Sequence, residues 1–276
     1  MKLQFRKMQG LGNDFVVFDA IGQNIELSEQ QLRFLADRRF GVGCDQILLV
    51  EPPRSSDTDF YYRIFNADGT EVEQCGNGAR CFARFVRDKG LSCKDVIRVG
   101  TAAGAIRLYL QEDGWVRADM GAPELRPQAI PFVAEQQQGE YDILVNGERR
   151  KISAVSMGNP HAVLVVNDVE QAPVATLGPA LERHERFPRG ANVGFMAVLS
   201  PGEIDLRVYE RGAGETLACG SGACAAVVAG RLRGLLGERV KVHLPGGDLV
   251  VSWAGDQSPV WMSGPAVGVF EGTIEL

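Results

Sequence analysis

The 276-residue sequence predicts an α/β protein made of two related halves, each with many short strands and one central helix. Three observations support this prediction. The chain is about as long as a single domain with one hydrophobic core can be, which favours two domains. Short runs of β-branched and aromatic residues recur along it, separated by glycine-rich turns. A cysteine-glycine phrase occurs twice, as CGNG at 75–78 and CGSG at 219–222.

The repeat extends beyond these two phrases. At an offset of 144 residues, residues 63–90 align with residues 207–234. The identical pairs are Arg63/Arg207, Glu71/Glu215, Cys75/Cys219, Gly76/Gly220, Gly78/Gly222, Ala79/Ala223, Arg87/Arg231 and Gly90/Gly234. At an offset of 146, GNDFVVF (12–18) matches GNPHAVL (158–164) more loosely. Because the matched segments keep their order, two related domains explain them better than chance does.

The strands and the first helix are predicted from local pattern. Residues 28–39 read as a helix with Ser28 as its N-cap. Over residues 118–150 we expect the segment that crosses from one domain to the other, together with a surface loop. The predicted strands are 47–51, 61–65, 96–100, 106–110, 115–120, 162–166, 193–199, 206–209, 240–244 and 249–253.

A helix is predicted after each cysteine-glycine phrase. In the first, Phe82, Phe85 and Val86 share one face, and Gly90 is suited to end the helix. In the second, ACAAVVAG (223–230) is apolar on all sides, which is typical of a helix enclosed by other elements.

Composition excludes several classes of function. A net charge of −6 and a pI near 5.3 disfavour a nucleic-acid-binding surface. The N-terminal residues lack the apolar core of a signal peptide, and no run approaches the ~20 apolar residues of a membrane helix. We therefore expect a cytoplasmic protein without a membrane partner. Six cysteines without a CxxC pair, together with three histidines, predict neither a disulfide scaffold nor a metal site.

A cysteine at the start of a helix combines two chemical functions. The helix N-terminus carries unpaired N–H groups and partial positive charge, which suit a carboxylate or phosphate. The same field is expected to lower the pKa of the thiol. Two such units facing one ligand would place an acid and a base on opposite faces of an acidic carbon, so that neither a metal nor a pyridoxal cofactor is needed.

These residues alone are also compatible with other functions. A single CGxG before a helix is weak support for catalysis, and the glycine spacing does not fit a dinucleotide-binding fingerprint. The same geometry would serve a redox switch that joins Cys75 to Cys219. A non-catalytic amino-acid-binding module, or a racemase acting on proline or hydroxyproline, would also use part of it.

Six motifs together resemble the diaminopimelate epimerase family over essentially the whole chain. They are LGNDF (11–15), GVGCDQ (41–46), FNADGTEVEQCGNGARC (65–81), MGNPH (157–161), ANVGF (191–195) and YERGAGETLACGSGA (209–223). The resemblance implies cofactor-independent interconversion of LL- and meso-2,6-diaminopimelate, in lysine and peptidoglycan-precursor synthesis. It also implies two pseudo-symmetric domains, each a sheet or barrel wrapped round a central helix, with the active site in the cleft between them.

The resemblance also assigns roles to individual residues. It implies Cys75 and Cys219 as the catalytic acid/base pair, tuned by His161 and Glu210. The implied carboxylate binders beside the reacting carbon are Gly76, Asn77, Gly220 and Ser221. The implied binders of the far end of the substrate are Asn66, Asn159, Asn192 and Arg211 for the carboxylate and Glu210 for the amine, with further contacts from Asn13 and Gln46. Singly, the asparagines also fit turns, and Glu210 with Arg211 a surface ion pair.

The resemblance further implies domain limits and an assembly. The N-terminal domain is expected over residues 1–118 plus a returning C-terminal strand at about 264–276, and the C-terminal domain over 119–263. A homodimer is implied. Phe270 stands where family members commonly have a tyrosine thought to support the dimer, so one interface hydrogen bond, worth about 1 kcal/mol, would be missing.

Overall fold

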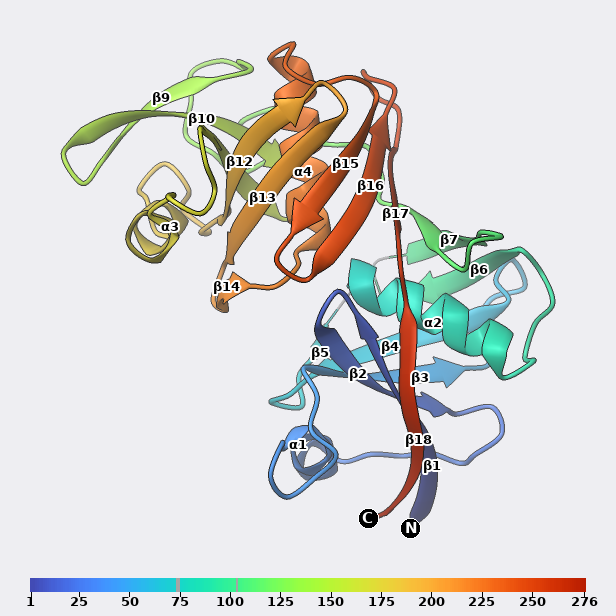
Figure 1. The fold of residues 1–276 in the computed structure, drawn as a ribbon. Helices are drawn as coiled ribbons and strands as arrows, with labels where there is room; N and C mark the ends of the chain where they lie inside the picture. Colours follow the sequence, from blue (N-terminus) through green and yellow to red (C-terminus); the bar gives the residue numbers. More distant parts are fainter. Residues whose placement is uncertain (73–74, 103) are drawn as a thin grey trace. The chain divides into compact units, whose positions relative to one another are not determined.

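The structure is a computed structural model that describes residues 1–72, 75–102 and 104–276. These residues form two compact units, Met1–Asp119 with Ser263–Leu276, and Met120–Met262 (Figure 1). Each unit has its own set of paired strands and its own central helix. The two units are described separately below.

The first unit is a mixed sheet in the order β18-β1-β2-β3-β4-β6-β7-β8. The β2–β3 and β4–β6 pairs are parallel and the others antiparallel. Its elements are β1 (Lys2–Gly10), β2 (Asn13–Asp19), α1 (Glu29–Ala36), β3 (Gln46–Glu51), β4 (Phe60–Asn66), β5 (Glu71–Val72), α2 (Gly76–Asp88), β6 (Val96–Thr101), β7 (Gly104–Leu110), β8 (Val116–Asp119) and β18 (Val267–Glu275). Because β18 pairs with β1, the two chain ends lie side by side (Figure 1).

The second unit pairs its strands in the order β9-β10-β11-β12-β13-β15-β16. Here β11–β12 and β13–β15 are the parallel pairs. Its elements are β9 (Tyr141–Val145), β10 (Glu148–Ser156), β11 (Pro160–Val166), α3 (Val174–Glu182), β12 (Asn192–Ser200), β13 (Glu203–Glu210), β14 (Gly214–Thr216), α4 (Gly220–Leu232), β15 (Arg239–Leu244), β16 (Gly247–Trp253) and β17 (Val260–Gly264), which carries the chain back to the first unit.

The two units repeat one another element by element. The order β1-β2-α1-β3-β4-β5-α2-β6-β7 recurs as β10-β11-α3-β12-β13-β14-α4-β15-β16. The parallel or antiparallel sense of each corresponding pair is the same in both units. The predicted fold of two related, sheet-dominated α/β halves with a central helix is confirmed.

The two central helices begin and end in the same way. α2 and α4 each span 13 residues, with Cys75 and Cys219 as N-caps. At the C-termini, Gly90 and Gly234 adopt left-handed backbone with φ of 68° and 69°. Their N–H groups, and those of the residues that follow, bond to carbonyls of the last turn, as in a Schellman motif. The predicted stop at Gly90 is confirmed, and Gly234 is its repeat.

The central helices differ in how they are buried. α2 packs against β1, β2, β3, β7 and β8, and its first residues and apolar face are buried. α4 contacts β10, β11, β12, β13 and β16 and is buried continuously from Gly222 to Gly230 (Figure 1). This continuous burial explains why its sequence is apolar on every side. In the described ranges no helix is long and apolar enough to cross a membrane.

Two local expectations need correction, and one helix was not predicted. The helix predicted at 28–39 begins as expected, with Ser28 and Gln31 forming a capping box, but ends at Ala36. The reason is that the Asp37 carboxylate accepts from the N–H groups of Arg39 and Phe40 and turns the chain. Residues expected as loop within 118–150 include β9 and the start of β10, and α3 was not predicted.

Candidate active site

Each of the two cysteines stands at a helix start that packs tightly on the sheet. A Cβ at Gly78 would lie 2.6 Å from Tyr62 Oη on β4, and one at Gly222 would lie 3.1 Å from Val208 Cγ2 on β13. The second glycine of each CGxG phrase is therefore required by close approach of the helix to the equivalent strand. In both units this contact fixes where the N-cap cysteine sits.

The other predicted residues gather at strand ends near each cysteine. In the first unit, Asn13 opens β2, Gln46 opens β3 and Asn66 closes β4. In the second unit, Asn159 precedes β11, Asn192 opens β12 and Glu210 closes β13. We call these groups the Cys75 cluster and the Cys219 cluster. The first comprises Asn13, Gln46, Asn66, Cys75, Gly76 and Asn77; the second comprises Asn159, His161, Asn192, Glu210, Arg211, Cys219, Gly220 and Ser221.

In the Cys75 cluster the amide of Asn13 faces the thiol. Cys75 Sγ donates to Asn13 Oδ1 at 3.7 Å, and Asn77 Nδ2 donates to the same oxygen at 3.3 Å. Gln46 Nε2 donates to Asn66 Oδ1 at 3.0 Å. Gln46 Oε1 is buried and accepts no hydrogen bond from the described residues, so this acceptor is available to a ligand N–H.

An ionic network holds Asn13 in this orientation. Asp45 Oδ2 accepts from Asn13 Nδ2 at 3.0 Å, which leaves the amide oxygen toward the thiol. Arg38 bonds both Asp14 and Asp45, and the Lys7 ammonium lies 2.6 Å from Asp14 Oδ2. Despite partial burial, these cations hold the pKa of Asp14 well below its usual range.

Arg80 supports the first turn of α2 from inside the unit. Its side chain is fully buried, Nη2 donates to Asn77 Oδ1 at 2.9 Å, and Nε donates to the Pro265 carbonyl at 3.2 Å. Nη1 donates to the Gly76 carbonyl. The guanidinium thus ties the Cys75 cluster to the chain that returns after β17.

In the Cys219 cluster the thiol is more enclosed. Cys219 is 3% exposed, whereas Cys75 is partly exposed. Cys219 Sγ accepts from the Gly222 N–H at 3.4 Å and lies 3.6 Å from Ser221 Oγ. Burial and the neighbouring Glu210 carboxylate raise the pKa of the Cys219 thiol well above its usual value. Thr216 Oγ1 donates to Glu210 Oε1 and holds that carboxylate in place.

The raised pKa corrects one expectation for Cys219. The helix N-terminus was expected to favour a thiolate. Loss of solvation and the nearby Glu210 carboxylate outweigh the hydrogen bonds from Ser221 and Gly222, which lower the pKa. Cys219 is therefore a protonated thiol at neutral pH, suited to donate a proton.

The remaining residues of the Cys219 cluster form linked pairs. His161 Nε2 and Asn159 Oδ1 are 3.0 Å apart. Asn192 Oδ1 accepts from the Arg211 backbone N–H at 2.9 Å, and the Arg211 guanidinium is exposed and donates to the Arg189 carbonyl. Burial, aided by the charge of Arg211, lowers the pKa of His161 to about 3, so its ring is neutral.

The clusters contain residues that the sequence analysis did not single out. Asp45, Arg80 and Thr216 each fix a predicted residue but were not singled out. Asp45 lies inside the GVGCDQ motif and Arg80 inside GNGARC, so position within a matched motif was the available signal. In addition, His161, which was expected to tune the thiols, is not hydrogen-bonded to Cys219 among the described residues.

Solved structures share this architecture at low sequence identity. A phenazine biosynthesis protein of the PhzF family from Bacillus anthracis is 17% identical, with a TM-score of 0.73 and 100% of both chains covered. A probable proline racemase from Agrobacterium radiobacter K84 is 18% identical, with a TM-score of 0.72, covering 99% of this chain and 93% of that one. These likenesses show the fold alone.

Sequence comparison is more specific. The pattern that defines the family described as "Diaminopimelate epimerase" matches residues 5–126 and 153–269. Diaminopimelate epimerases from Thioalkalivibrio sulfidiphilus and Alkalilimnicola ehrlichii are 65% and 61% identical to the chain, each over the full length of both proteins. The matched ranges include every residue of both clusters. The chain belongs to the diaminopimelate epimerase family.

Proposed function

We propose that the protein interconverts LL- and meso-2,6-diaminopimelate by a two-base mechanism in which Cys75 and Cys219 are the opposed acid and base. The duplicated placement of the two thiols carries this proposal: each caps a 13-residue helix beside the ends of equivalent strands. Inversion of an α-carbon needs a base on one face and an acid on the other. As in the family, the product would serve lysine and peptidoglycan-precursor synthesis.

The surroundings of the thiols suggest which one begins as the acid. Burial and Glu210 favour the protonated form of Cys219. We therefore assign Cys219 as the proton donor and Cys75, once its own thiol proton has been lost, as the base. The electron pair of the broken C–H bond moves into the substrate carboxylate, and the S–H proton of Cys219 then forms the new C–H bond on the opposite face. The step leaves Cys75 protonated and Cys219 deprotonated, which is the form required for the reverse direction.

The helix N-termini supply the positive field for the carbanion. The backbone N–H groups of Gly76, Asn77, Gly220 and Ser221 lie in the first turns of α2 and α4, where no intrahelical partner exists. Directed at the carboxylate beside the reacting carbon, they stabilise the charge that develops there. This chemistry uses no metal or organic cofactor.

The far end of diaminopimelate carries a second ammonium and a second carboxylate. We assign the carboxylate to Asn66, Asn159, Asn192 and Arg211, and the amine to Glu210, with further contacts from Asn13 and Gln46. The exposed Arg211 guanidinium suits a carboxylate. The buried Gln46 Oε1 lacks a donor among the described residues, which suits an ammonium.

The test is α-hydrogen exchange in deuterated water under reducing conditions, with LL-diaminopimelate compared with L-proline. We expect deuterium in the epimerised product, and none in the remaining substrate at early times, because different thiols remove and deliver the proton. Exchange with proline but not with diaminopimelate would overturn the substrate assignment. Binding of diaminopimelate without any exchange would indicate a binding module instead.

We further infer that the protein works as a homodimer in the cytoplasm. β18 exposes Val267, Val269 and Phe270, and the Phe270 ring packs edge-on against Phe5 with centroids 6.0 Å apart. All six cysteines are free thiols, which suits a reducing compartment. Sedimentation of Phe270→Lys against wild type tests the dimer, because a charge at a buried interface weakens association. An unchanged dimer would place the interface elsewhere.

A further inference from the structure

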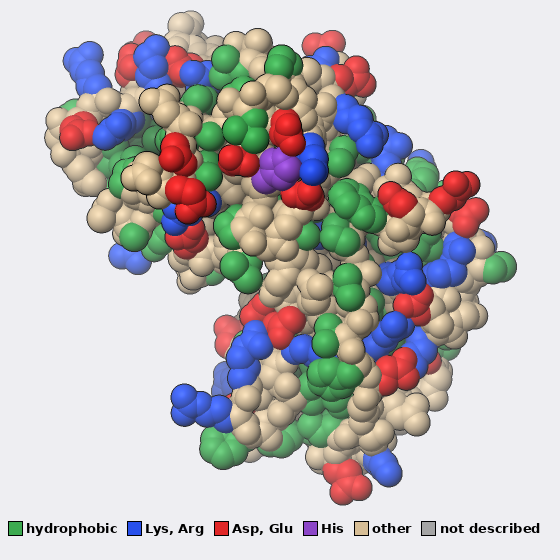
Figure 2. All heavy atoms as spheres, viewed as in Figure 1, with side chains coloured by type: hydrophobic (Ala, Val, Ile, Leu, Met, Phe, Trp, Pro, Cys, Tyr) green, Lys and Arg blue, Asp and Glu red, His purple; other side chains and the backbone are tan. Residues whose placement is uncertain are grey.

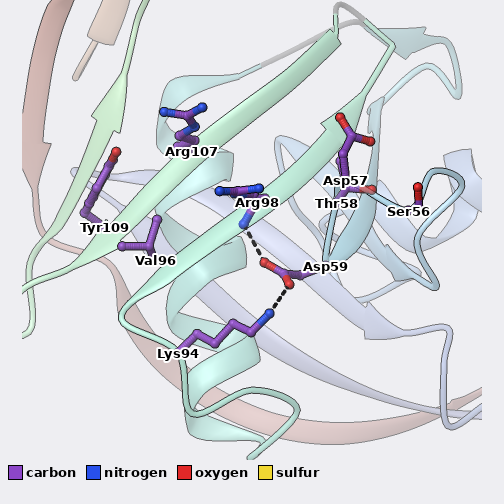
Figure 3. A pocket seen from close by; sticks show the side chains of 9 residues that line it. All are labelled: Ser56, Asp57, Thr58, Asp59, Lys94, Val96, Arg98, Arg107 and Tyr109. Carbon is purple, nitrogen blue, oxygen red and sulfur yellow. Dashed lines mark hydrogen bonds and ion pairs between the residues drawn. The ribbon is translucent and has the colours of Figure 1, made fainter.

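A groove of about 480 Å³ lies in the first unit, and none of its lining residues belongs to the Cys75 cluster (Figure 3). Its walls are the loop before β4, at residues 56–59, and the β6 and β7 strands. Along these strands Ile97, Val99 and Leu108 are buried, whereas the alternating Arg98 and Arg107 are exposed. The groove is therefore on the face of the β6–β7 hairpin opposite to its buried face.

Two arginines face one another in this groove. Arg98 on β6 and Arg107 on β7 are directly opposite in the antiparallel register. Neither guanidinium makes a hydrogen bond or ion pair with any of the residues that the structure describes. Like charges placed opposite one another on neighbouring strands repel and are destabilising.

The other charges of the groove are mostly matched. Lys94 Nζ lies 2.5 Å from Asp59 Oδ1, and Asp59 Oδ2 accepts from the Arg98 backbone N–H (Figure 3). Asp57 accepts from the Ser55 hydroxyl. With Lys94 and Asp59 neutralising each other, two arginines remain against the single carboxylate of Asp57.

The remaining wall of the groove is apolar and aromatic. Val96 and Tyr109 are cross-strand partners two register positions from the arginines, on the same face of the hairpin, and both line the groove. A bound anion at the arginines would thus have room beside it for an uncharged portion of a larger molecule.

We propose that Arg98 and Arg107 together bind a doubly charged oxyanion, namely the phosphate group of a small metabolite. A phosphate offers enough oxygens and charge to engage two guanidinium forks at once, whereas one carboxylate carries a single charge and two oxygens. Its binding would also remove the repulsion between the two arginines. The site is separate from the proposed epimerisation and does not depend on it.

The first experiment titrates the protein with inorganic phosphate by calorimetry at constant ionic strength, with acetate as the singly charged comparison. We expect phosphate to bind and acetate not to bind. Arg98→Gln and Arg107→Gln should each raise Kd about tenfold or more, and the double variant should show no binding. Arg149→Gln, which removes an exposed arginine from β10, is the matched control and should bind as wild type does.

Two further readouts separate a ligand site from a structural role. Without phosphate, Arg98→Gln should be at least as thermostable as wild type because repulsion is relieved; with phosphate, only wild type should gain stability. Phosphate should slow amide exchange in residues 96–110. Equal phosphate affinity in wild type and the double variant would overturn the proposal. So would protection confined to the first turns of α2 and α4, since phosphate would then occupy the helix N-termini.

Discussion

The Cys75 and Cys219 clusters are built on the same frame and differ in chemistry at a few positions. In both, a helix capped by cysteine starts beside the end of one strand and the beginnings of two others. Asn66 closes β4 where Glu210 closes β13, and Phe15 in β2 corresponds to His161 in β11. The duplicated frame places a thiol at the same position in each unit, and in the second unit burial and Glu210 raise the pKa of that thiol.

The Asn66/Glu210 difference is the most consequential. Asn66 is neutral and bonds to Gln46. Glu210 is a carboxylate that acts on Cys219 and raises its pKa. In a mechanism that needs one protonated and one deprotonated thiol, such asymmetry decides which thiol keeps the proton, because unequal surroundings give the two thiols unequal pKa values. The comparison therefore predicts that exchanging residues between the clusters changes catalysis more than stability.

Some shared residues brace the frame. Arg63 forms a bidentate fork to Glu71 with distances of 2.9 and 2.8 Å, and Arg207 forms the same fork to Glu215 with distances of 2.6 and 3.0 Å. Each fork joins the two strands of the hairpin that precedes Cys75 or Cys219. These identities in the repeat are explained by geometry and not by contact with a ligand.

The largest expected effect is on catalysis by loss of either thiol. Cys75→Ala and Cys219→Ala should each reduce epimerisation by about 10³-fold or more, because inversion needs both faces. Initial rates of conversion of LL- to meso-diaminopimelate measure this. Cys93→Ala, at an exposed cysteine outside both clusters, is the control and should keep full activity. If either cluster variant keeps more than a tenth of wild-type activity, that cysteine is not an acid or base in the reaction.

The next effect concerns the charge difference between the clusters. Glu210→Gln should lower the pKa of Cys219, because it removes a neighbouring carboxylate, and should slow epimerisation by about 10- to 100-fold. The rate of alkylation of Cys219 against pH, read by peptide mass spectrometry, reports the thiol pKa. Asn66→Gln, the matched change in the Cys75 cluster, alters no charge and should leave the Cys219 profile unchanged. An unshifted profile in Glu210→Gln would leave burial as the sole cause.

The sequence predicted those parts of the fold that depend on local residue preferences or that are repeated in both halves of the chain. Ser28, Gly90 and the helices after both CGxG phrases follow from local residue preferences and were confirmed. The β9–β10 hairpin was missed although Asn146 and Gly147 carry positive φ, as a tight hairpin turn requires. The polar run before it concealed the alternation of buried Tyr141, Ile143 and Val145.

Other features could not be read from local pattern. α3 contains Pro179 and begins after Pro173, so its propensity is poor and tertiary packing of Val174, Leu177 and Leu181 must hold it. In the candidate site, motifs indicated Cys75, Asn13 and Gln46. The bond from Asn13 to Asp45 and the bond from the buried Arg80 to Pro265 join residues distant in sequence, so they are seen only in the folded structure.

A smaller effect follows from the Phe15/His161 difference. The folded state keeps His161 neutral with a pKa of about 3, whereas the unfolded value is 6.5. The unfolded chain therefore binds a proton that the folded chain does not, and the free energy of unfolding falls as pH falls below 6.5. His161→Phe, which copies the first unit, should remove a slope approaching about 1.4 kcal/mol per pH unit between pH 6.5 and 5.

Urea unfolding at several pH values measures that slope. His243 provides a control of opposite sign. Its pKa is raised, first by the hydrogen bond to Glu203 and then by the bond to Asp248, so its stabilisation is present below pH 6.5 and lost as pH rises. His243→Gln should therefore cost more stability at pH 6 than at pH 8. Equal slopes for wild type and His161→Phe would show that the buried imidazole takes up a proton in the folded state.

The smallest effect separates the two arginine forks. Both are partly exposed, so Glu71→Gln and Glu215→Gln should each cost about 1 kcal/mol or less. The costs should nevertheless differ. After Glu71→Gln, Arg63 keeps its ion pair with Glu51 at 3.3 Å. After Glu215→Gln, the acceptor that remains to Arg207 among the described residues is the neutral Val169 carbonyl, at 2.8 Å. Amide exchange in β4 and β13 should thus accelerate more for Glu215→Gln; a larger change for Glu71→Gln would show that Glu51 does not compensate.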